Sequence, residues 1–316
     1  MELDIVLPVF EEQEVIEYSH RELVAELEKL ENFLLLDWRI IYCLDHSRDE
    51  TEKILIDIAR QDPRVFIISM VGRSGHQNAI MKGVEFSREN AYLVIMDADG
   101  QHPPSVIGNM LQKLQPGPFV VHAVRVQSRD PRLLVRILSL IFYRLLRLIS
   151  NVEIAPGKTD FKLLSPLVAQ VIRKHYKDSR VFLRAFIESL QFPSSRVEFN
   201  APERKFGKSK FSYMRLFRFA FSGVLSFSTK PLTLISVIGA ATLFLALILS
   251  SFTVYLYFAE NSQPPGYSTL VIVFLFFSSI QILSLGAVGI YLVQVLEQLR
   301  SRPRSIVSNV YHFDSK

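Results

Sequence analysis

Two long uncharged stretches toward the C-terminal end constrain this chain of 316 residues more than any other feature. No residue within 232–259 carries a charge, and none does within 261–296. A helix needs about 20 apolar residues to cross the hydrocarbon core of a bilayer. Both stretches are longer, so the sequence predicts transmembrane helices over residues 231–259 and 269–297. The segment 260–268 between them contains two prolines and a glycine and predicts a short loop.

The basic residues around this predicted hairpin indicate its orientation. The loop has no Lys or Arg, whereas basic residues flank the hairpin on both sides, at Arg215, Arg218, Lys230, Arg300, Arg302 and Arg304. Cytoplasmic flanks of membrane helices are enriched in Lys and Arg, and the first residues do not have the pattern of a secretory signal. We therefore expect an integral membrane protein with both termini in the cytoplasm, juxtamembrane amphipathic helices over 203–230 and a cytoplasmic tail over 298–316.

The first hundred residues alternate between short apolar runs and longer amphipathic runs. Strands are expected at 3–9, 38–45, 64–70 and 91–97, and helices at 11–31, 49–60 and 76–89. The strands are almost wholly apolar, which is typical of a parallel sheet covered by helices on both faces. The predicted fold class is therefore α/β, Rossmann-like, with a mostly parallel sheet in a cytosolic domain over 1–202.

Polar and acidic residues follow three of these predicted strands, in clusters at 8–12, 45–49 and 97–101. An open α/β sheet binds ligands outside the carboxyl ends of its strands, so all three clusters fall where the fold builds a site. A single Asp at a strand end is common in turns and helix caps. The coincidence of three clusters favours a ligand site over three separate turns.

Asp97 and Asp99, in the segment Asp-Ala-Asp, carry the most specific chemistry. Carboxylate oxygens with positions left open for phosphate suit a hard divalent cation such as Mg²⁺. Alternate residues of an extended segment point the same way, so both carboxylates are expected to face one ion. Taken alone, two aspartates ahead of Pro103 and Pro104 fit a polar turn equally well.

Net charge and cysteine content narrow the classes of function. The net charge is +5, but the basic residues gather beside the membrane segments, where anionic lipid is a simpler partner than nucleic acid. A helix predicted over 132–150 has its four arginines on one side, which fits either a membrane-surface helix or a packed helix with a solvated basic edge. Cys43 is the only cysteine, which excludes an internal disulfide and a multi-cysteine metal site.

An ordered series of motifs extends along nearly the whole chain. It comprises LPVFEE, LDHSRDET, GHQNAIMKG, DADGQHPP, TDFKLL, RKFGKSKF and VLSFSTKPL, followed by the two apolar spans and RSRPRSIV. This order resembles the polyprenyl-phosphate hexosyltransferases, relatives of dolichyl-phosphate mannose synthase and of bacterial undecaprenyl-phosphate glucosyltransferases. These are inverting family-two glycosyltransferases of GT-A fold. The resemblance runs from about Leu3 to Val307.

The resemblance implies roles for individual residues on the donor side. It implies that the nucleotide sugar is bound by Pro8, Glu12, Asp45 and Asp97. Binding of Mg²⁺ or Mn²⁺ with the donor diphosphate falls on Asp97, Asp99 and Gln101, which gives Asp99 a catalytic part through the metal. His76 and Gln77, at the start of a predicted helix, either contact the donor or simply cap and solvate that helix.

On the acceptor side, Asp160 of the TDF motif matches a carboxylate that relatives place near the acceptor as a catalytic base. Arg184, Arg204 and Lys210 match basic residues expected to meet phosphate, since Arg and Lys beside a membrane can pair with a lipid phosphate. A lipid phosphate is largely ionised at pH 7, so Asp160 is expected to orient the acceptor more than to deprotonate it. Its alternative role is to cap the following turn.

Several residues depart from the family pattern. Leu44 stands where a second aspartate is common, and His46 and Glu11 replace a glycine and an asparagine. Gly100 and His102 stand in the DADGQHPP motif where leucine and aspartate are usual, and Lys162 of TDFKLL replaces an arginine. The identity of the donor therefore does not transfer from any relative.

The implied activity is transfer of a hexose, of glucose or mannose type, from a UDP- or GDP-hexose to a polyprenyl phosphate, undecaprenyl or dolichyl, at the cytoplasmic face. The expected partners are these two substrates and the lipid bilayer, with no nucleic acid and with homo-oligomer formation left open. One alternative, a processive polysaccharide synthase, lacks support because the only tryptophan, Trp38, cannot supply a QxxRW motif. A catalytically silent subunit of a glycosylation complex is the other alternative, suggested by Leu44 and His46.

Overall fold

A computed structural model describes residues 1–114, 117, 119–126, 158–176, 183–200, 266–299 and 305–313, and single positions between 237 and 255. The helix predicted over 132–150 and the juxtamembrane segment 203–230, with Arg204 and Lys210, lie outside the described residues. The chain divides into two compact units. One comprises Met1–Tyr143, Val152–Leu216 and Pro303–Lys316, and the other comprises Arg144–Asn151 and Phe217–Arg302.

The described residues of the first unit form an eight-stranded sheet in the order β7-β5-β6-β4-β1-β2-β3-β8. The strands are β1 (Glu2–Val9), β2 (Asp37–Leu44), β3 (Val65–Met70), β4 (Tyr92–Ile95), β5 (Val120–Arg125), β6 (Lys158–Leu164), β7 (Ser194–Phe199) and β8 (Val307–Tyr311). Strands β4, β1, β2 and β3 run parallel to one another, as predicted, and β5 runs parallel to β7. The predicted α/β fold with a mostly parallel sheet is confirmed.

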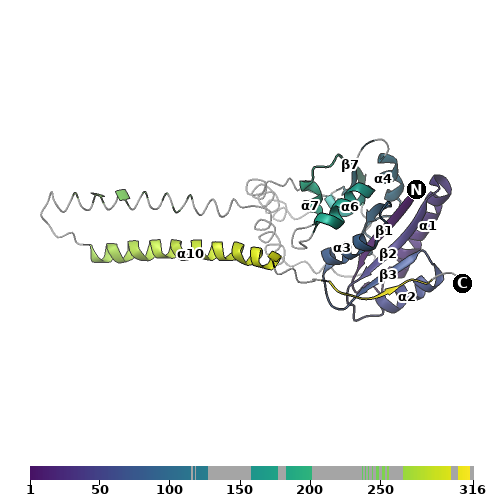
Figure 1. The fold of residues 1–316 in the computed structure, drawn as a ribbon, viewed down its shortest axis with the longest axis horizontal. Helices are drawn as coiled ribbons and strands as arrows, with labels where there is room; N and C mark the ends of the chain where they lie inside the picture. The colour runs from purple at the N-terminus through teal and green to yellow at the C-terminus, as the bar shows by residue number, and fades with distance from the viewer. Residues whose placement is uncertain are drawn as a thin grey trace. The chain divides into compact units, whose positions relative to one another are not determined.

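Helices cover both faces of this sheet (Figure 1). They are α1 (Ile16–Leu34), α2 (Thr51–Gln61), α3 (His76–Phe86), α4 (Val106–Lys113), α6 (Pro166–His175) and α7 (Leu183–Ser189). Buried residues of α1, α2 and α4 join one hydrophobic cluster with the sheet, and those of α3, α6 and α7 join a second. Successive strand residues point to opposite faces, so Ile5 and Leu7 belong to the first cluster and Val6 to the second.

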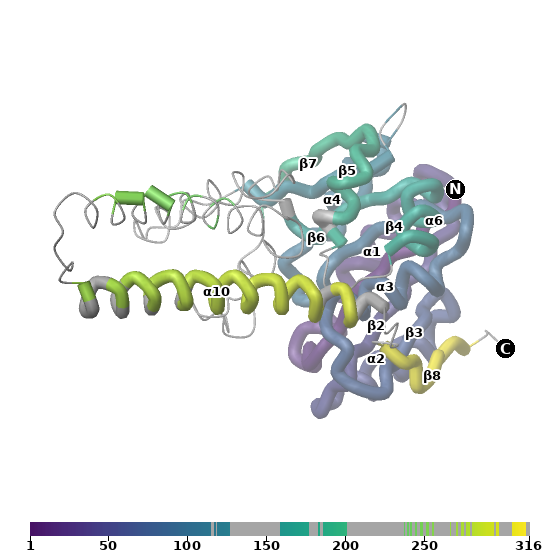
Figure 2. The backbone as a smooth tube through the Cα atoms, turned by 60° about the vertical axis from the view of Figure 1, so that its left-hand side comes forward, coloured from purple at the N-terminus to yellow at the C-terminus, as the bar shows by residue number. Residues whose placement is uncertain are grey.

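Three strand pairings are antiparallel, and the sequence did not predict them. Strand β6 pairs with β4 on one side and with β5 on the other, and β8 adds to the outer edge of β3. Strand β8 lies within the segment expected to be a cytoplasmic tail, so the chain returns to the sheet after the apolar segments. Figure 2 shows β8 beside β3 near the C-terminal end of the trace.

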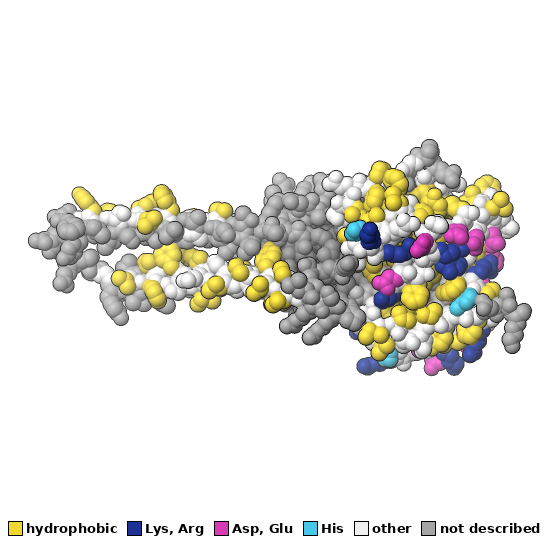
Figure 3. All heavy atoms as spheres, viewed as in Figure 1, with side chains coloured by type: hydrophobic (Ala, Val, Ile, Leu, Met, Phe, Trp, Pro, Cys, Tyr) yellow, Lys and Arg dark blue, Asp and Glu magenta, His cyan; other side chains and the backbone are white. Residues whose placement is uncertain are grey.

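The second unit is described mainly by α10 (Tyr267–Leu299). It is the one helix among the described residues that is long and apolar enough to cross a membrane, over Phe276–Val293. Its large apolar side chains are exposed, for example Leu283 at 73% and Ile282 at 69%, and Figure 3 shows apolar side chains along the helix. The helix coincides with the predicted span over 269–297. The predicted span over 231–259 is described only at single positions.

Candidate functional site

The carboxyl ends of β1 and β2 are joined by hydrogen bonds between their loops. The backbone nitrogens of Glu11 and Glu12 donate to Ser47 Oγ and Thr51 Oγ1, at 3.1 and 3.0 Å. Glu11 adopts a positive φ of 52°, a conformation that asparagine, the usual residue here in relatives, tolerates better than glutamate. These contacts fix the loop that contains Glu12. Pro8 lies buried within β1.

Asp45, at the end of β2, is 4% exposed and supports the loop before α3. Its Oδ1 accepts hydrogen bonds from the nitrogen and hydroxyl of Ser74, at 2.6 and 3.0 Å, and its Oδ2 accepts one from the nitrogen of Gly75 at 2.8 Å. Gly75 has a φ of 88°, which L side chains rarely adopt. Both oxygens of Asp45 therefore hold a backbone turn. Its contact with a nucleotide stays a prediction.

The Asp-x-Asp segment is bent where the sequence predicted it to be extended. Strand β4 ends at Ile95, and Gly100 has a φ of 75°. Asp99 Oδ1 accepts a hydrogen bond from the backbone nitrogen of Gln101 at 3.1 Å, and Asp99 Oδ2 accepts one from Gln101 Nε2 at 2.9 Å. The positive φ explains why glycine occupies position 100, since a leucine there would strain the backbone.

The buried side chain of His102 anchors this loop to the sheet. It is 6% exposed, and its Nδ1 accepts a hydrogen bond from the backbone nitrogen of Asp97 at 2.9 Å. Its ring stacks on Phe161, with 5.0 Å between ring centroids, and meets the edge of Phe199. His102 thus connects the loop to Phe161 of strand β6, the residue that follows Asp160. The departure from aspartate at this position gives the loop an aromatic anchor.

The antiparallel register of β4 and β6 brings Asp160 to the same edge as Asp97. Ile95, the last residue of β4, pairs with Lys162. Asp97, two residues beyond the end of β4, therefore lies across from Asp160, two residues back along β6. Lys162 Nζ lies 4.0 Å from Asp160 Oδ1, and the Lys162 side chain is 1% exposed. The TDF motif identified Asp160 in the sequence, but not the burial of Lys162 beside it.

His76, the first residue of α3, lies between the two carboxylates. Its Nε2 is 3.6 Å from Asp97 Oδ1 and 3.5 Å from Asp160 Oδ2. Removal from water lowers the pKa of His76, but the hydrogen bond to Asp160 and the charges of Asp97, Asp160 and Asp99 raise this pKa above its ordinary value. The pKa of Asp97 lies above its ordinary value, mainly because the carboxyl group is removed from water. The charges of His102 and His76 lower this pKa, and those of Asp160 and Asp99 raise it.

The donor atoms of this edge suit a hard divalent cation. Asp97, Asp99 and Gln101 offer carboxylate and amide oxygens, which Mg²⁺ and Mn²⁺ prefer. Among the described residues, no group of three or more His, Cys, Asp or Glu side chains is arranged to hold a metal. A Mg²⁺ ion is commonly held by one or two carboxylates and completes its shell with water and substrate phosphate, so the residues present fit such an ion.

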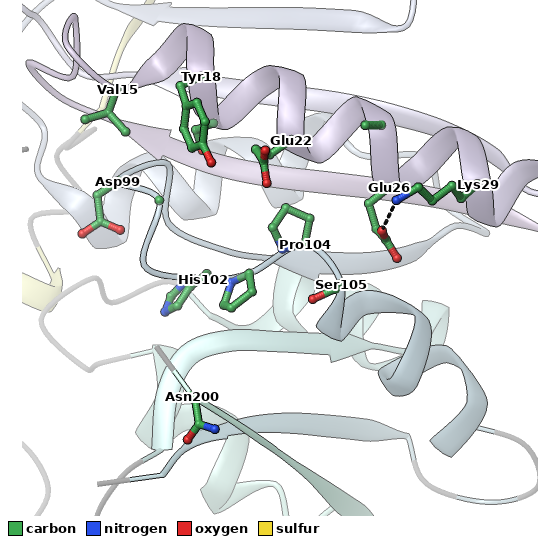
Figure 4. Close-up of a pocket in the computed structure, with 14 residues that line it drawn as sticks. Val15, Tyr18, Glu22, Glu26, Lys29, Asp99, His102, Pro104, Ser105 and Asn200 are labelled. Atoms are coloured by element: carbon green, nitrogen blue, oxygen red, sulfur yellow. Dashed lines mark hydrogen bonds and ion pairs between the residues drawn. The ribbon is translucent and has the colours of Figure 1, made fainter. Parts of the chain in front are cut away.

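A cavity of about 420 Å³ lies between the bent segment and α1. Figure 4 shows Asp99 and His102 on one wall and Tyr18 and Glu22 on the wall formed by α1. Asn200 lies at the far side of the cavity. Asp99 therefore borders this cavity.

The predicted acceptor-side residues are only partly within the described structure. The backbone of Arg184 lies in α7, and its side chain is not described. The helix is tied to α3, because the nitrogen of Leu183 donates to Gln77 Oε1 at 3.0 Å. The structure thus brings together Asp97, Asp160 and His76 directly, and connects Asp45 to them through the loop at 74–75.

Known proteins resemble this chain along most or all of its length. Residues 4–165, just over half of the chain, match the family described as Glycosyl transferase family 2. The chain is 30% identical over 316 residues to the uncharacterized glycosyltransferase YkcC of Bacillus subtilis, covering 100% of this chain and 96% of YkcC.

Two further relatives have more specific names. The chain is 30% identical over 310 residues to a prophage bactoprenol glucosyl transferase homolog of Escherichia coli, covering 98% and 99% of the two chains. It is 28% identical over 309 residues to the bactoprenol glucosyl transferase of Shigella phage SfX, again covering 98% and 99%. The resemblance found in the motifs is thereby confirmed. The chain belongs to glycosyl transferase family 2, and it is a glycosyltransferase.

Proposed function

We propose that this protein is a membrane-bound inverting enzyme that transfers a hexose from a nucleotide diphosphate sugar to a polyprenyl phosphate at the cytoplasmic face. The observation that carries the proposal is the approach of Asp97 and Asp160 to one side chain, His76, at the carboxyl edge of the sheet. Full-length relatives named bactoprenol glucosyl transferase support a polyprenyl phosphate as the acceptor.

In the proposed reaction, an oxygen of the lipid phosphate attacks the anomeric carbon of the donor sugar. The bond from that carbon to the donor diphosphate breaks, and the nucleoside diphosphate leaves from the opposite side with the electron pair. Asp160 orients the attacking phosphate, which needs positioning more than deprotonation. Arg184, Arg204 and Lys210 pair with phosphate oxygens of the substrates.

On the donor side, Asp97, Asp99 and Gln101 would hold a Mg²⁺ or Mn²⁺ ion. When bound, such an ion neutralises charge that develops on a departing diphosphate. Pro8, Glu12, Asp45 and Asp97 form the proposed nucleotide-sugar side of the site, with Asp45 acting at least through the loop at 74–75 that it holds.

The position of β8 supports two membrane crossings. Strand β8 follows α10 in the chain and pairs with β3 of the catalytic unit. A chain that leaves a domain on one side of a membrane and returns to the same domain crosses the membrane an even number of times. If α10 spans the bilayer, a second span must therefore precede it, and the predicted span over 231–259 is uncharged from residue 232 and long enough.

This topology can be tested with single cysteines in a Cys43→Ser background. Ser262→Cys, in the predicted hairpin loop, should react with a membrane-impermeant maleimide only from the side opposite the catalytic domain. Ser308→Cys, in β8, should react only from the side of that domain. Labelling of both positions from the same side would exclude the two-span hairpin.

The activity is tested with purified protein in detergent, Mg²⁺ or Mn²⁺, undecaprenyl phosphate and a panel of radiolabelled UDP- and GDP-hexoses. The expected product is a lipid carrying one sugar. Polymer would indicate a polysaccharide synthase, and no product from any donor would indicate a silent subunit. Either result would refute the proposal.

A further inference from the structure

The backbone at His76 is held firmly, although the side chain is 44% exposed. The loop that precedes it is fixed by three hydrogen bonds to Asp45 and by the positive φ of Gly75. The first turn of α3 adds a hydrogen bond from Asn78 Nδ2 to the carbonyl of Ser74, at 2.6 Å. Asp45, directly after strand β2, thus determines where the backbone of His76 lies, through contacts that need no bound substrate.

The carboxylate of Asp160 has a different neighbour on each oxygen. His76 Nε2 lies 3.5 Å from Oδ2, and Lys162 Nζ lies 4.0 Å from Oδ1. The final torsion of an aspartate side chain is broad when nothing fixes it. Donors on both sides restrict the plane in which this carboxylate lies.

The same His76 nitrogen lies 3.6 Å from Asp97 Oδ1. Asp97 belongs to the proposed donor side and Asp160 to the proposed acceptor side, and they come from separate strands. A single side chain that contacts both can set the separation between the two halves of the reaction. A displacement of about 1 Å in such a geometry costs on the order of 100-fold in rate.

We propose that His76 is a positioning residue that donates to Asp160, fixes the orientation of its carboxylate and sets its distance from Asp97. This inference rests on the proposed function for its kinetic consequence. The competing roles of His76 are a direct contact with the donor and a structural role at the start of α3.

The kinetic test compares His76→Ala and His76→Gln with wild type, using UDP-glucose and undecaprenyl phosphate or whichever hexose donor supports wild-type turnover. Loss of a side chain that orients a catalytic group costs about 10–100-fold in activity. We expect this loss in kcat for His76→Ala, with little change in the KM for the donor. His76→Gln retains a donor group and should recover most of kcat. His175→Ala, at the exposed end of α6, is the matched control and should behave as wild type.

Three outcomes would overturn the inference. A raised KM for the donor with kcat preserved would make His76 a donor contact. A lowered unfolding midpoint with kcat preserved would make it structural. Equal impairment of His76→Gln and His76→Ala would exclude a donating role. Residues that act as a unit are not additive, so His76→Ala should add little in an Asp160→Asn background, and a full additional loss would also contradict the proposal.

A spectroscopic measurement tests the contact without turnover. The Nε2 resonance of His76, assigned by its absence from His76→Ala, should shift on substitution of Asp160→Asn and stay in place on substitution of His175→Ala. An unmoved resonance would refute the contact even if the enzyme transfers sugar to lipid. Conversely, wild-type protein that forms no lipid-linked sugar would refute the proposed function while this shift still reports on His76 and Asp160.

Discussion

Asp45 and Asp97 both follow buried parallel strands, yet they have different surroundings. Asp45 accepts three hydrogen bonds from the loop at 74–75. Asp97 lies near His76 and His102, and removal from water together with the neighbouring acids Asp160 and Asp99 raises its pKa. The comparison teaches that acidic residues at the edge of one sheet divide into a group that holds the loops and a group that lies close to other ionisable side chains.

The two groups should respond differently to loss of charge. A carboxylate that satisfies backbone donors contributes to stability, because its removal leaves those donors without a partner. A carboxylate that lies close to other carboxylates lowers stability, because like charges repel. Such destabilisation is common in functional sites. Stability and activity measured together therefore separate the two groups.

The largest expected effect is that of Asp97→Asn on activity. Loss of a proposed metal ligand should lower the transfer rate by about 100-fold or more. The pKa of Asp97 is higher in the folded protein than the value of 3.8 expected in the unfolded chain. Protonated Asp97 therefore favours folding at a pH below 3.8, and this stabilisation is lost as the pH rises through the folded pKa. Above the folded pKa the ionised side chain opposes folding, so Asp97→Asn should leave the free energy of unfolding equal or raise it. A clear loss of stability would place Asp97 with Asp45.

Asp45→Asn should lower both stability and activity. The amide presents an NH₂ group to one of the backbone nitrogens whose hydrogen bonds Asp45 accepts, which costs about 1–3 kcal/mol of unfolding free energy. The misplaced loop should also move His76 and reduce turnover. Denaturant unfolding at pH 7 checks this, with Asp57→Asn as the control, because Asp57 is exposed on α2 and contacts the side chain of Arg60. Unchanged stability with lost activity would instead favour a direct role for Asp45 in binding nucleotide.

Gly75→Ala tests the loop without touching a carboxylate. No atom lies within 4 Å of an added Cβ, so the cost comes from the backbone conformation alone, about 1–3 kcal/mol. Gly72→Ala also has open space, without a positive φ, and serves as the control. If both variants unfold at the same denaturant concentration, the strained turn does not contribute to the difference between the two groups of acids.

The smallest expected effect concerns a group away from the edge. The pKa of His20 lies below its ordinary value, mainly because the ring is buried. The charge of Asp62 opposes this shift and the charge of Arg64 adds to it. The Nδ1 atom of His20 lies 3.0 Å from the hydroxyl of Tyr42. The unfolded chain takes up a proton below about pH 6.5 that the folded protein does not. Unfolding free energy should therefore fall as pH decreases from this value to the folded pKa, and His20→Gln should remove that part of the slope.

Much of the fold was predictable because the first half of the sheet is local in sequence. Each of β1 to β4 is an apolar run, and α1 to α3 connect them in order. The antiparallel partners β6 and β8 were not predicted, because their pairing joins segments distant in the chain. Strand β8 is only five residues long and follows a long apolar segment, so no periodic pattern identifies it.

Candidate site residues could be named from the sequence, but their geometry could not. The edge position of Asp45 and Asp97 followed from strand order, whereas the approach of Asp160 depends on the register of β4 with β6. The roles of Gly100 and His102 follow from a backbone angle and a stacking contact. Neither can be read from residue type, so both stood out only as departures from the family pattern.

The most direct test of the central claim is the initial rate of lipid-linked sugar formation by Asp160→Asn. The claim is that Asp160, brought to Asp97 by strand β6, forms the acceptor side of the reacting centre. Loss of a group that orients or deprotonates the acceptor should lower the rate by about 10²–10⁴-fold, with the unfolding midpoint unchanged. A wild-type rate from Asp160→Asn would contradict the account.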